Sequence, residues 1–208
     1  MLDVGGHFPS TTTGAWVRVA EAGSIPILAT SRRQGVCLGM RFRRRGSGEG
    51  AMSERLVRLC MDPDSVISVF ASLRFVAETT GRVPPGVLDF DAASEKFCRH
   101  FGANLLGDSL SLPLLLGLHL AHVGTPWPAD VYATGAIRRA RGYRCSSVAG
   151  ARAKLRLLEA IGYRRLFLPR KNHRELRLAG FDLQRATALP TKVSTCLEIW
   201  DAFVRGTA

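Results

Sequence analysis

Alternating apolar and polar positions mark short strands in the first part of the chain. Trp16–Val19, Ile25–Ala29 and Val36–Arg43 have the pattern of half-buried strands. Asp64 is placed to cap a helix that runs to about Thr80, in which apolar residues recur at helical spacing. Strands interspersed with such helices predict an α/β (α+β) fold with a mixed sheet packed against helices. The predicted buried stripe of that helix comprises Val66, Val69, Phe70, Leu73, Val76 and Ala77.

Shorter elements and loops surround these segments. Ser53 caps a predicted helix that begins at Glu54. Arg43–Gly50 is charged and rich in glycine, and we interpret it as a solvated turn because no Gly-Lys-Ser/Thr follows it. Residues 81–86 form the clearest predicted hinge. Two further strands are expected, at Val87–Phe90 and Phe97–Phe101.

The pattern changes at Gly107, where a polar turn leads into a long apolar run. Leucines lie on every side of the segment Leu112–Leu118, which predicts a helix buried on all faces. Ser109 directly precedes this helix, where a buried element would hold its side chain rigidly. A serine in that position is usually only a helix cap, so it becomes a candidate nucleophile only if a base is available.

Lys154 is the candidate base. In the predicted helix Gly150–Ile161 it shares its face with Leu157 and Leu158, whereas the charged side chains lie opposite. Burial disfavours the charged form of a lysine and lowers its pKa toward that of a neutral base. We predict that this helix packs beside the helix after Ser109, with Lys154 turned inward. The alternative is a lysine that extends past the helix end into solvent.

The composition leaves a second class of function open. The chain has 208 residues and a formal net charge of +12, and of its 29 basic residues only Lys96, Lys154, Lys171 and Lys192 are lysines. Such a charge makes nucleic acid or another acidic partner an alternative, though a weak one because the charge is spread along the chain. The expected patch comprises Arg41, Arg43–Arg45 and Arg138–Arg141.

Other classes find little support in the sequence. The five cysteines form no Cys-x-x-Cys pair and are expected to be reduced thiols, as in a cytoplasmic protein. His119 and His122 lie three residues apart without a third ligand, so we predict neither a metal nor a cofactor. The N-terminus has no signal-peptide pattern, and the apolar run after Ser109 is too short to span a bilayer. No membrane partner is expected.

Four blocks of the central segment, which contain Ser109, Thr134-Gly135, Lys154 and Asn172 in this order, resemble the proteolytic domain of Lon proteases, which cleave peptide bonds with a Ser-Lys dyad. The resemblance covers residues 100–205 well and residues 20–100 only in the pattern of elements. Its B-type branch carries Gly-Asp-Ser-Ala-Ser at the nucleophile. Four blocks match in order: Gly107-Asp108-Ser109-Leu110-Ser111, Asp130-Val131-Tyr132-Ala133-Thr134-Gly135, Ala149-Gly150-Ala151-Arg152-Ala153-Lys154-Leu155 and Leu166-Phe167-Leu168-Pro169-Arg170-Lys171-Asn172.

The resemblance implies a role for each matched residue. Ser109 would be the nucleophile and Lys154 the general base, while Thr134, next to Gly135, would position the lysine and Asp108 would shape the turn. The chain departs from the family at Ala136, where glutamate is usual, at Ala149, which replaces a glycine, and at Leu110, which replaces a small residue. About two extra residues also lie between Gly135 and Lys154. An inactive scaffold of the same fold is therefore one alternative, beside the nucleic-acid-binding domain.

The resemblance also predicts organisation and partners. Residues 1–20 would be a loosely ordered lead-in, and residues 21–208 a single Lon-like domain. The chain has no Walker A pattern and no room for an ATPase module, so it would cut unfolded or flexible proteins or peptides, alone or fed by a separate ATPase. Thr195–Glu198 matches a capping box, followed by a helix with Leu197, Trp200 and Val204 on its packed face. The rim of that helix is a candidate homo-oligomer interface.

Overall fold

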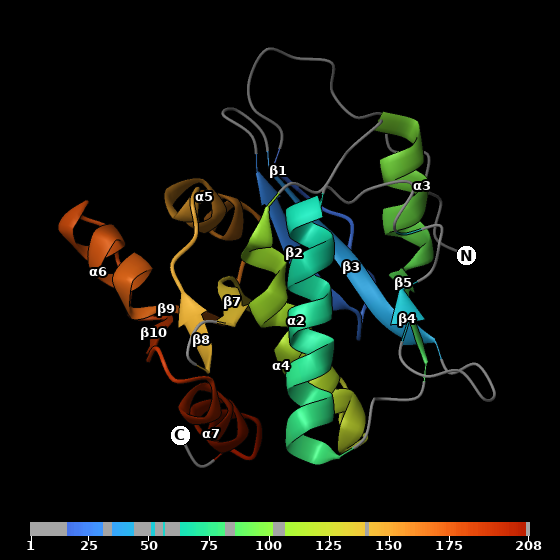
Figure 1. Ribbon diagram of the computed structural model, residues 1–208. Helices are drawn as coiled ribbons and strands as arrows, with labels where there is room; N and C mark the ends of the chain where they lie inside the picture. Colours follow the sequence, from blue (N-terminus) through green and yellow to red (C-terminus); the bar gives the residue numbers. More distant parts are fainter. Residues whose placement is uncertain are drawn as a thin grey trace.

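The computed structural model describes residues 16–30, 35–43, 51–52, 56, 63–81, 86–101, 107–139 and 142–206 (Figure 1). These residues form the predicted α/β fold with mixed sheets. The strands are β1 (Trp16–Arg18), β2 (Ile25–Thr30), β3 (Gly35–Arg43), β4 (Ala51–Met52), β5 (Val87–Phe90), β6 (Val131–Ala133), β7 (Ala136–Arg139), β8 (Tyr143–Ser146), β9 (Arg165–Pro169) and β10 (Ala186–Leu189). The helices are α2 (Pro63–Thr80), α3 (Ala92–Phe101), the 3₁₀ turn η1 (Asp108–Leu110), α4 (Ser111–His122), α5 (Ala151–Ile161), α6 (Arg170–Leu178) and α7 (Val193–Val204).

Strand β3 is the centre of the larger sheet. Strand β2 runs antiparallel to it, with Ile27 opposite Leu38, and β5 runs antiparallel to its second half, with Phe90 opposite Met40. Strand β1 is parallel to the first half of β3, and the short β4 is parallel to β5. The predicted strands in this region are confirmed, except the one at Phe97–Phe101.

The C-terminal half contributes a parallel sheet and a hairpin. Strand β9 lies between β6 and β10, parallel to both. Strands β7 and β8 form an antiparallel pair that directly follows β6 and its Thr134-Gly135 turn. The backbone N–H of Thr134 donates to the carbonyl of Phe167 at 3.0 Å, which extends the pairing of β6 with β9 by one residue. The turn after β6 is therefore fixed by the sheet itself.

Successive residues of β2 belong to two different hydrophobic cores. Ile25 and Ile27 pack in the core that includes the α4 leucines, whereas Leu28 packs in the one that includes Leu155 of α5. This is the alternation expected of a strand whose two faces are both covered. Helix α4 contacts β2, β6, β7 and α2, and α5 contacts β1, β2, β3 and α6.

The helix pattern around Lys154 is confirmed, but its predicted packing partner is wrong. Helix α5 spans Ala151–Ile161 and turns Lys154 inward, as expected. It does not pack beside α4, because strand β2 is in contact with both helices and lies between their cores. An amphipathic pattern identifies the buried face of a helix but not the element that covers it.

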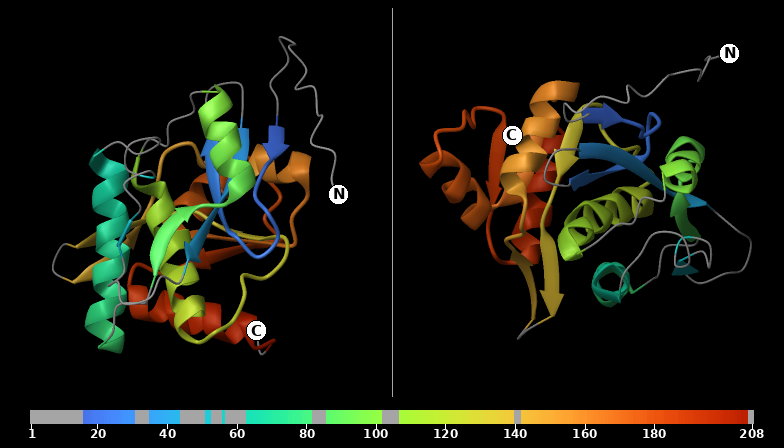
Figure 2. Two further views of the ribbon diagram at one scale, coloured as in Figure 1. Left: turned by 90° about the vertical axis from the view of Figure 1, so that its right-hand side faces the viewer. Right: turned by 90° about the horizontal axis from the view of Figure 1, so that it is seen from above.

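Helix α4 is buried as the leucine run predicts. Apart from the half-buried His119, all its side chains from Ser111 to Leu120 are enclosed. Seen from above, α4 lies between α2 and the strands (Figure 2, right). Gly117 lets it approach the sheet closely, because a Cβ atom at this position would overlap the side chain of Ile25. Helix α4 is thus packed between α2 and the strands.

Helix α2 buries Val69, Leu73 and Val76 of the predicted stripe, but not all of it. Phe70 is exposed, while Ser65, Ser68 and Ser72 are buried toward α4 and η1. Small hydroxyl side chains allow close packing and can satisfy backbone acceptors, and Ser72 Oγ donates to the carbonyl of Ser111 at 2.8 Å. The helix begins at Pro63, so Asp64 lies in its first turn instead of capping it.

Two further predictions are wrong: the strand at Phe97–Phe101 and the capping box at Thr195–Glu198. Phe97–Phe101 belongs to helix α3, not to a strand. Asp91 explains this helix, because its Oδ1 accepts the backbone N–H of Ser94 at 2.8 Å in the manner of an N-cap. Helix α7 begins at Val193, so Thr195 lies inside it and forms no capping box. Its expected face is nevertheless packed: Trp200 is fully buried, and Leu197 and Val204 pack against the core.

Several expectations lie outside the described residues. They concern the lead-in up to residue 15, the loop at residues 44–50, the Ser53 cap with the start of its helix at Glu54, and most of the 81–86 hinge.

Asp91→Ala tests the capping account. This buried carboxylate also accepts the backbone N–H of Glu21 at 2.9 Å, so its removal leaves two backbone donors without a partner. We expect the free energy of unfolding to fall by about 2 to 4 kcal/mol, as measured by urea denaturation. The exposed Asp182, which accepts one local N–H from Gln184, is the control, and Asp182→Ala should cost less than about 1 kcal/mol. Equal losses would contradict the assignment.

Candidate active site

Ser109 lies in the 3₁₀ turn η1 that leads into α4. The turn begins after Gly107, whose φ of 93° is a conformation that side-chain-bearing residues rarely adopt. The glycine of the first matched block is therefore required by the backbone. Ser109 is partly exposed, and among the described residues its hydroxyl has no hydrogen-bond partner. It does not act as a helix cap and remains accessible.

The neighbouring Ser111 has a structural role. Its side chain is fully buried, and its hydroxyl donates to the carbonyl of Asp108 at 2.7 Å. The same oxygen accepts the backbone N–H of Ile137 at 2.7 Å. Both the donor and an acceptor site of this hydroxyl are thus used to join the start of α4 to strand β7. Of the two serines in this block, Ser109 is the one whose hydroxyl makes no described hydrogen bond.

Gly135 joins the turn after β6 to the serine turn. Its backbone N–H donates to the carbonyl of Ser109 at 3.2 Å, and its carbonyl accepts the N–H of Leu112 at 3.0 Å. A Cβ atom at this position would come within 2.9 Å of a Leu112 methyl carbon and 3.0 Å of Pro169 Cγ. Only a residue without a side chain fits here unless its neighbours shift. The Thr134-Gly135 turn is therefore held directly against Ser109.

Lys154 of α5 contacts the Thr134-Gly135 turn from the hydrophobic core that includes Leu155. Only 4% of its surface is exposed, and its Nζ donates to Thr134 Oγ1 at 2.9 Å. Burial lowers the pKa of Lys154 to about 8, although the Asp108 carboxylate opposes part of that shift. About one Lys154 side chain in ten is then neutral at pH 7, compared with a negligible fraction for a lysine of ordinary pKa.

Asp108 is engaged by a residue that the sequence assigned to a different role. Arg138 Nη2 lies 2.8 Å from Asp108 Oδ2, and Arg138 Nε donates to the same oxygen at 3.2 Å. Arg138 was expected in a nucleic-acid patch, but here it pairs with the carboxylate whose charge raises the pKa of Lys154. No motif in the chain indicated this pairing, because it depends on the β7–β8 hairpin that follows Gly135.

Asn172, the last residue of the fourth matched block, has a structural role. Its side chain is 1% exposed, its Oδ1 accepts the N–H of Val148, and its Nδ2 donates to the carbonyl of Val148, both at 2.9 Å. This pair of bonds fixes the backbone just before Gly150, which has a φ of 72° and begins α5. Asn172 on α6 therefore holds the first turn of the helix that carries Lys154.

The three departures from the Lon pattern have local explanations. Leu110 is buried in the core around α4, so its bulk points away from solvent. Ala136 is fully buried at the start of β7, where a glutamate would place a carboxylate in the core. Ala149 is exposed in a turn and is not among the described residues with positive φ, so alanine is tolerated there.

The structure brings Ser109, Thr134, Gly135, Lys154 and Asp108 into one neighbourhood. It does not join the two proposed reacting groups directly. No hydrogen bond between Ser109 Oγ and Lys154 Nζ is present, although both residues belong to the described part of the chain; the amine donates to Thr134 instead. Thr134 therefore lies between the amine and the serine turn.

The two histidines considered as metal ligands are not part of a cluster. His119 Nε2 lies 2.7 Å from Asp201 Oδ1 and ties the end of α4 to α7. Within the described ranges, no group of three or more His, Cys, Asp or Glu side chains comes together as a metal site would require.

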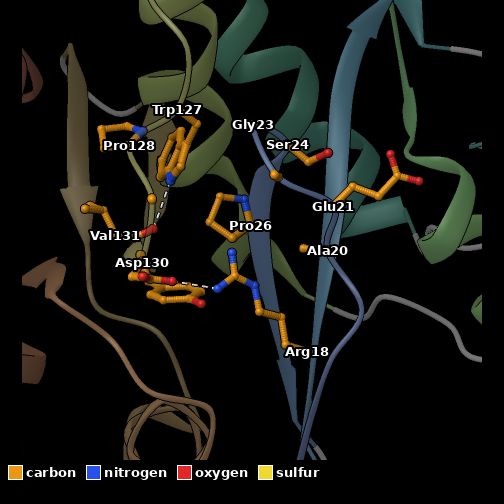
Figure 3. Close-up of a pocket in the computed structure, with 13 residues that line it drawn as sticks. Arg18, Ala20, Glu21, Gly23, Ser24, Pro26, Trp127, Pro128, Asp130 and Val131 are labelled. Carbon is orange, nitrogen blue, oxygen red and sulfur yellow. Dashed lines mark hydrogen bonds and ion pairs between the residues drawn. The ribbon is translucent and has the colours of Figure 1, made fainter. Parts of the chain in front are cut away.

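A small pocket of about 80 Å³ lies apart from these residues (Figure 3). It is lined by the turn after β1 and by the segment from Trp127 to Tyr132, and includes none of Ser109, Thr134 or Lys154. Arg18 crosses it to Asp130 at 2.7 Å. Asp130 has a φ of 55°, and its carbonyl accepts the N–H of Arg164, so the second matched block begins with a structural aspartate.

Sequence comparison adds no relative. Neither a scan against models of known protein families nor a search of curated proteins finds a match. The resemblance to Lon therefore rests on the four sequence blocks alone. None of the helices that the structure describes combines the length and apolar character needed to cross a membrane.

The pKa of Lys154 can be measured directly, because the chain has only four lysines. In protein labelled at the lysine side chains, Lys154→Met identifies the Lys154 NMR signal, which should titrate near pH 8. Asp108→Asn removes the carboxylate that raises this pKa, so the midpoint should fall further. Asp201→Asn removes an equal charge from the hydrogen-bonded contact between Asp201 and His119 and should leave the midpoint unchanged. A midpoint that rises in Asp108→Asn contradicts the arrangement.

The same burial makes Lys154 costly for stability. The unfolded chain binds a proton at this lysine up to about pH 10.5, whereas the folded protein releases it near pH 8. Lys154→Met should therefore raise the free energy of unfolding by about 2 kcal/mol at pH 7, after allowing for the lost hydrogen bond to Thr134. The gain should be fully present below pH 8 and disappear as the pH rises to 10.5. Urea titrations at several pH values measure it, and a loss of stability at pH 7 contradicts this account.

Proposed function

We propose that this chain is a Lon-like serine endopeptidase that hydrolyses peptide bonds with Ser109 and Lys154. The observation that carries the proposal is a buried lysine of lowered pKa, bonded to Thr134 beside the turn that binds Ser109. A buried amine is costly, and the chain uses arginine at nearly every other basic position. Arginine cannot replace it as a base, because its guanidinium remains protonated.

The reaction follows from the chemistry of the two groups. Lys154 in its neutral form accepts the proton of Ser109 as Oγ attacks the carbonyl carbon of the peptide. The lysine then gives that proton to the leaving amine as the peptide C–N bond breaks, which leaves an acyl group on Ser109. A water molecule then gives a proton to the Lys154 amine and attacks the ester carbon. As the ester C–O bond breaks, the lysine returns the proton to Ser109 Oγ and the carboxylic acid product leaves. The N-terminus of buried helix α4 carries partial positive charge near the developing oxyanion.

Thr134 is proposed to orient the base. Its hydroxyl accepts one N–H of the amine, so the lone pair of neutral Lys154 is directed by a residue fixed in the sheet. Ser109 Oγ has to turn toward that amine before reaction, and its freedom from other described hydrogen bonds permits this rotation. Asp108, paired with Arg138, is proposed to modulate the charge at the amine without reacting.

Substrate and partners are proposed from the resemblance to Lon. The proposed substrates are unfolded or flexible proteins and peptides, because no Walker A pattern of an unfolding ATPase is found in the sequence given. A separate ATPase that feeds substrates, and a homo-oligomer that encloses the site, are proposed as partners. The proposed compartment is the cytoplasm, because Cys37, Cys98, Cys145 and Cys196 are free thiols.

A catalytically inactive scaffold of the same fold is the second candidate. One observation favours it: Lys154 Nζ is bonded to Thr134 and not to Ser109. In a scaffold, the buried lysine would serve only to hold the turn after β6. The two candidates make opposite predictions for cleavage and for its dependence on pH.

Cleavage of a fluorescently labelled unfolded protein tests the proposal. Ser109→Ala, Lys154→Ala and Lys154→Arg should each reduce kcat/KM by at least about a thousandfold, and the losses should not add. Thr134→Ala should cost about ten- to a hundredfold, because it misplaces the amine without removing a reacting group, and Thr134→Ser should restore most of it. In the parent, activity should rise through pH 8 as Lys154 loses its proton.

Lys192→Arg is the matched control, because Lys192 is exposed and has no described side-chain contact with Ser109, Thr134 or Lys154. It should cleave like the parent. If Lys154→Arg also cleaves like the parent, Lys154 is not the base. If the parent never cleaves, alone or with a candidate ATPase, the scaffold takes the place of the enzyme.

A further inference from the structure

Helices α5 and α6 carry a group of exposed basic side chains that we call the basic face. The two helices contact each other and lie on the side of the molecule away from α3 (Figures 1 and 2). Their only acidic residues are Glu159 and Glu175. The basic face comprises Arg152, Arg156, Arg170, Lys171, Arg174 and Arg177, all of them exposed.

These cations contrast with six other arginines of the described structure, each of which pairs with a carboxylate. In the described part of the N-terminal half and in β7 these arginines are partly neutralised, whereas Arg144, Arg164 and Arg205 of the C-terminal half form no described ion pair but lie apart from one another in the sequence. In the described ranges, no residue of the basic face forms an ion pair or a side-chain hydrogen bond. The paired arginines are Arg18 with Asp130, Arg41 with Glu21, Arg74 with Glu78, Arg99 with Glu95, Arg138 with Asp108 and Arg139 with Glu78.

The basic face is also held in a fixed geometry. Leu155 and Leu158 anchor α5 on the sheet, and Leu176 and Asn172 anchor α6, all of them buried. On α5 the outward cations are four residues apart, at Arg152 and Arg156. On α6, Arg170, Arg174 and Arg177 are spaced by four and three residues, which places them along one stripe of the helix. The charges therefore form rows on a rigid support.

His173 lies on α6 among the cations of the basic face, and its pKa is shifted. Burial and then the guanidinium of Arg177 lower the pKa of His173 below its ordinary value. Burial is the larger of these two causes, and the smaller one is the repulsion expected next to a cation that has no described carboxylate partner.

We propose that the basic face binds the phosphate backbone of a nucleic acid. Arginine, which supplies five of its six cations, forms forked hydrogen bonds to phosphate oxygens, and a row of cations suits a ligand whose charges repeat. The patch expected from the sequence is a weaker candidate, because Arg41, Arg138 and Arg139 are already paired. The proposal does not rest on the peptidase function, since Lys154 lies on the opposite, buried side of α5.

An anionic membrane surface fits this region less well. A helix lying in a bilayer interface needs an apolar face that can enter the lipid. On α6 the inward side chains are already buried in the protein, and Leu178 at its end, 77% exposed, is its single exposed large apolar residue. The chemistry of the exposed surface is therefore that of charge without an apolar anchor.

The test measures binding of a fluorescein-labelled duplex DNA and of a labelled single-stranded RNA by anisotropy at several salt concentrations. Arg170→Gln/Arg174→Gln removes two cations of the basic face. We expect affinity for at least one of the two probes to fall about tenfold at low salt, and the slope of log Kd against log salt to decrease by about 2.

Arg74→Gln/Arg99→Gln is the matched control, because it removes the same charge from two exposed but ion-paired helical arginines. It should leave affinity within about twofold. Equal losses in both double variants would show that net charge alone drives binding and would overturn the proposal. So would a parent that binds neither probe, or one that binds only vesicles of anionic lipid or poly-glutamate. Unfolding curves matching the parent establish that both variants are folded.

Discussion

The buried amine of Lys154 is the constraint on which the candidate site depends. An amine enclosed among leucines needs a hydrogen-bond acceptor, and Thr134 supplies it at the end of β6. The backbone of Thr134 is fixed in turn by Phe167 on β9, and the next residue, Gly135, binds the carbonyl of Ser109. A short series of backbone bonds therefore sets the position of the serine turn relative to the amine, although the two come from different cores.

Much of the fold could be predicted from the periodicity of the chain, because buried faces repeat with the geometry of each element. The leucine run of α4 and the inward turn of Lys154 are examples. Predictions failed where a polar residue decided the structure. Asp91 starts α3 within a segment that has the apolar content of a strand, and the buried serines of α2 rotate its packed side away from Phe70. Nor can a single helix pattern indicate that a strand separates α5 from α4.

The residues of the site were accessible to sequence reasoning because their blocks combine required glycines with unusual polar residues. Gly107 and Gly135 are there for backbone reasons that the structure makes explicit. The partners of these residues could not be predicted. The pairing of Arg138 with Asp108 and the bonds of Ser111 to Asp108 and Ile137 depend on contacts across the hairpin, and such contacts leave no local pattern in the sequence.

Asn172 connects helix α6 to the segment that leads into α5, the helix that carries Lys154. It lies in the first turn of α6, and its two bonds to Val148 hold the backbone two residues before Gly150, from which the first turn of α5 starts. A shift of α6 over the sheet would strain both bonds and pull on the turn that carries Lys154. A force on the exposed face of α6 would therefore act, through the Asn172 side-chain amide, on the position of the buried Lys154 amine.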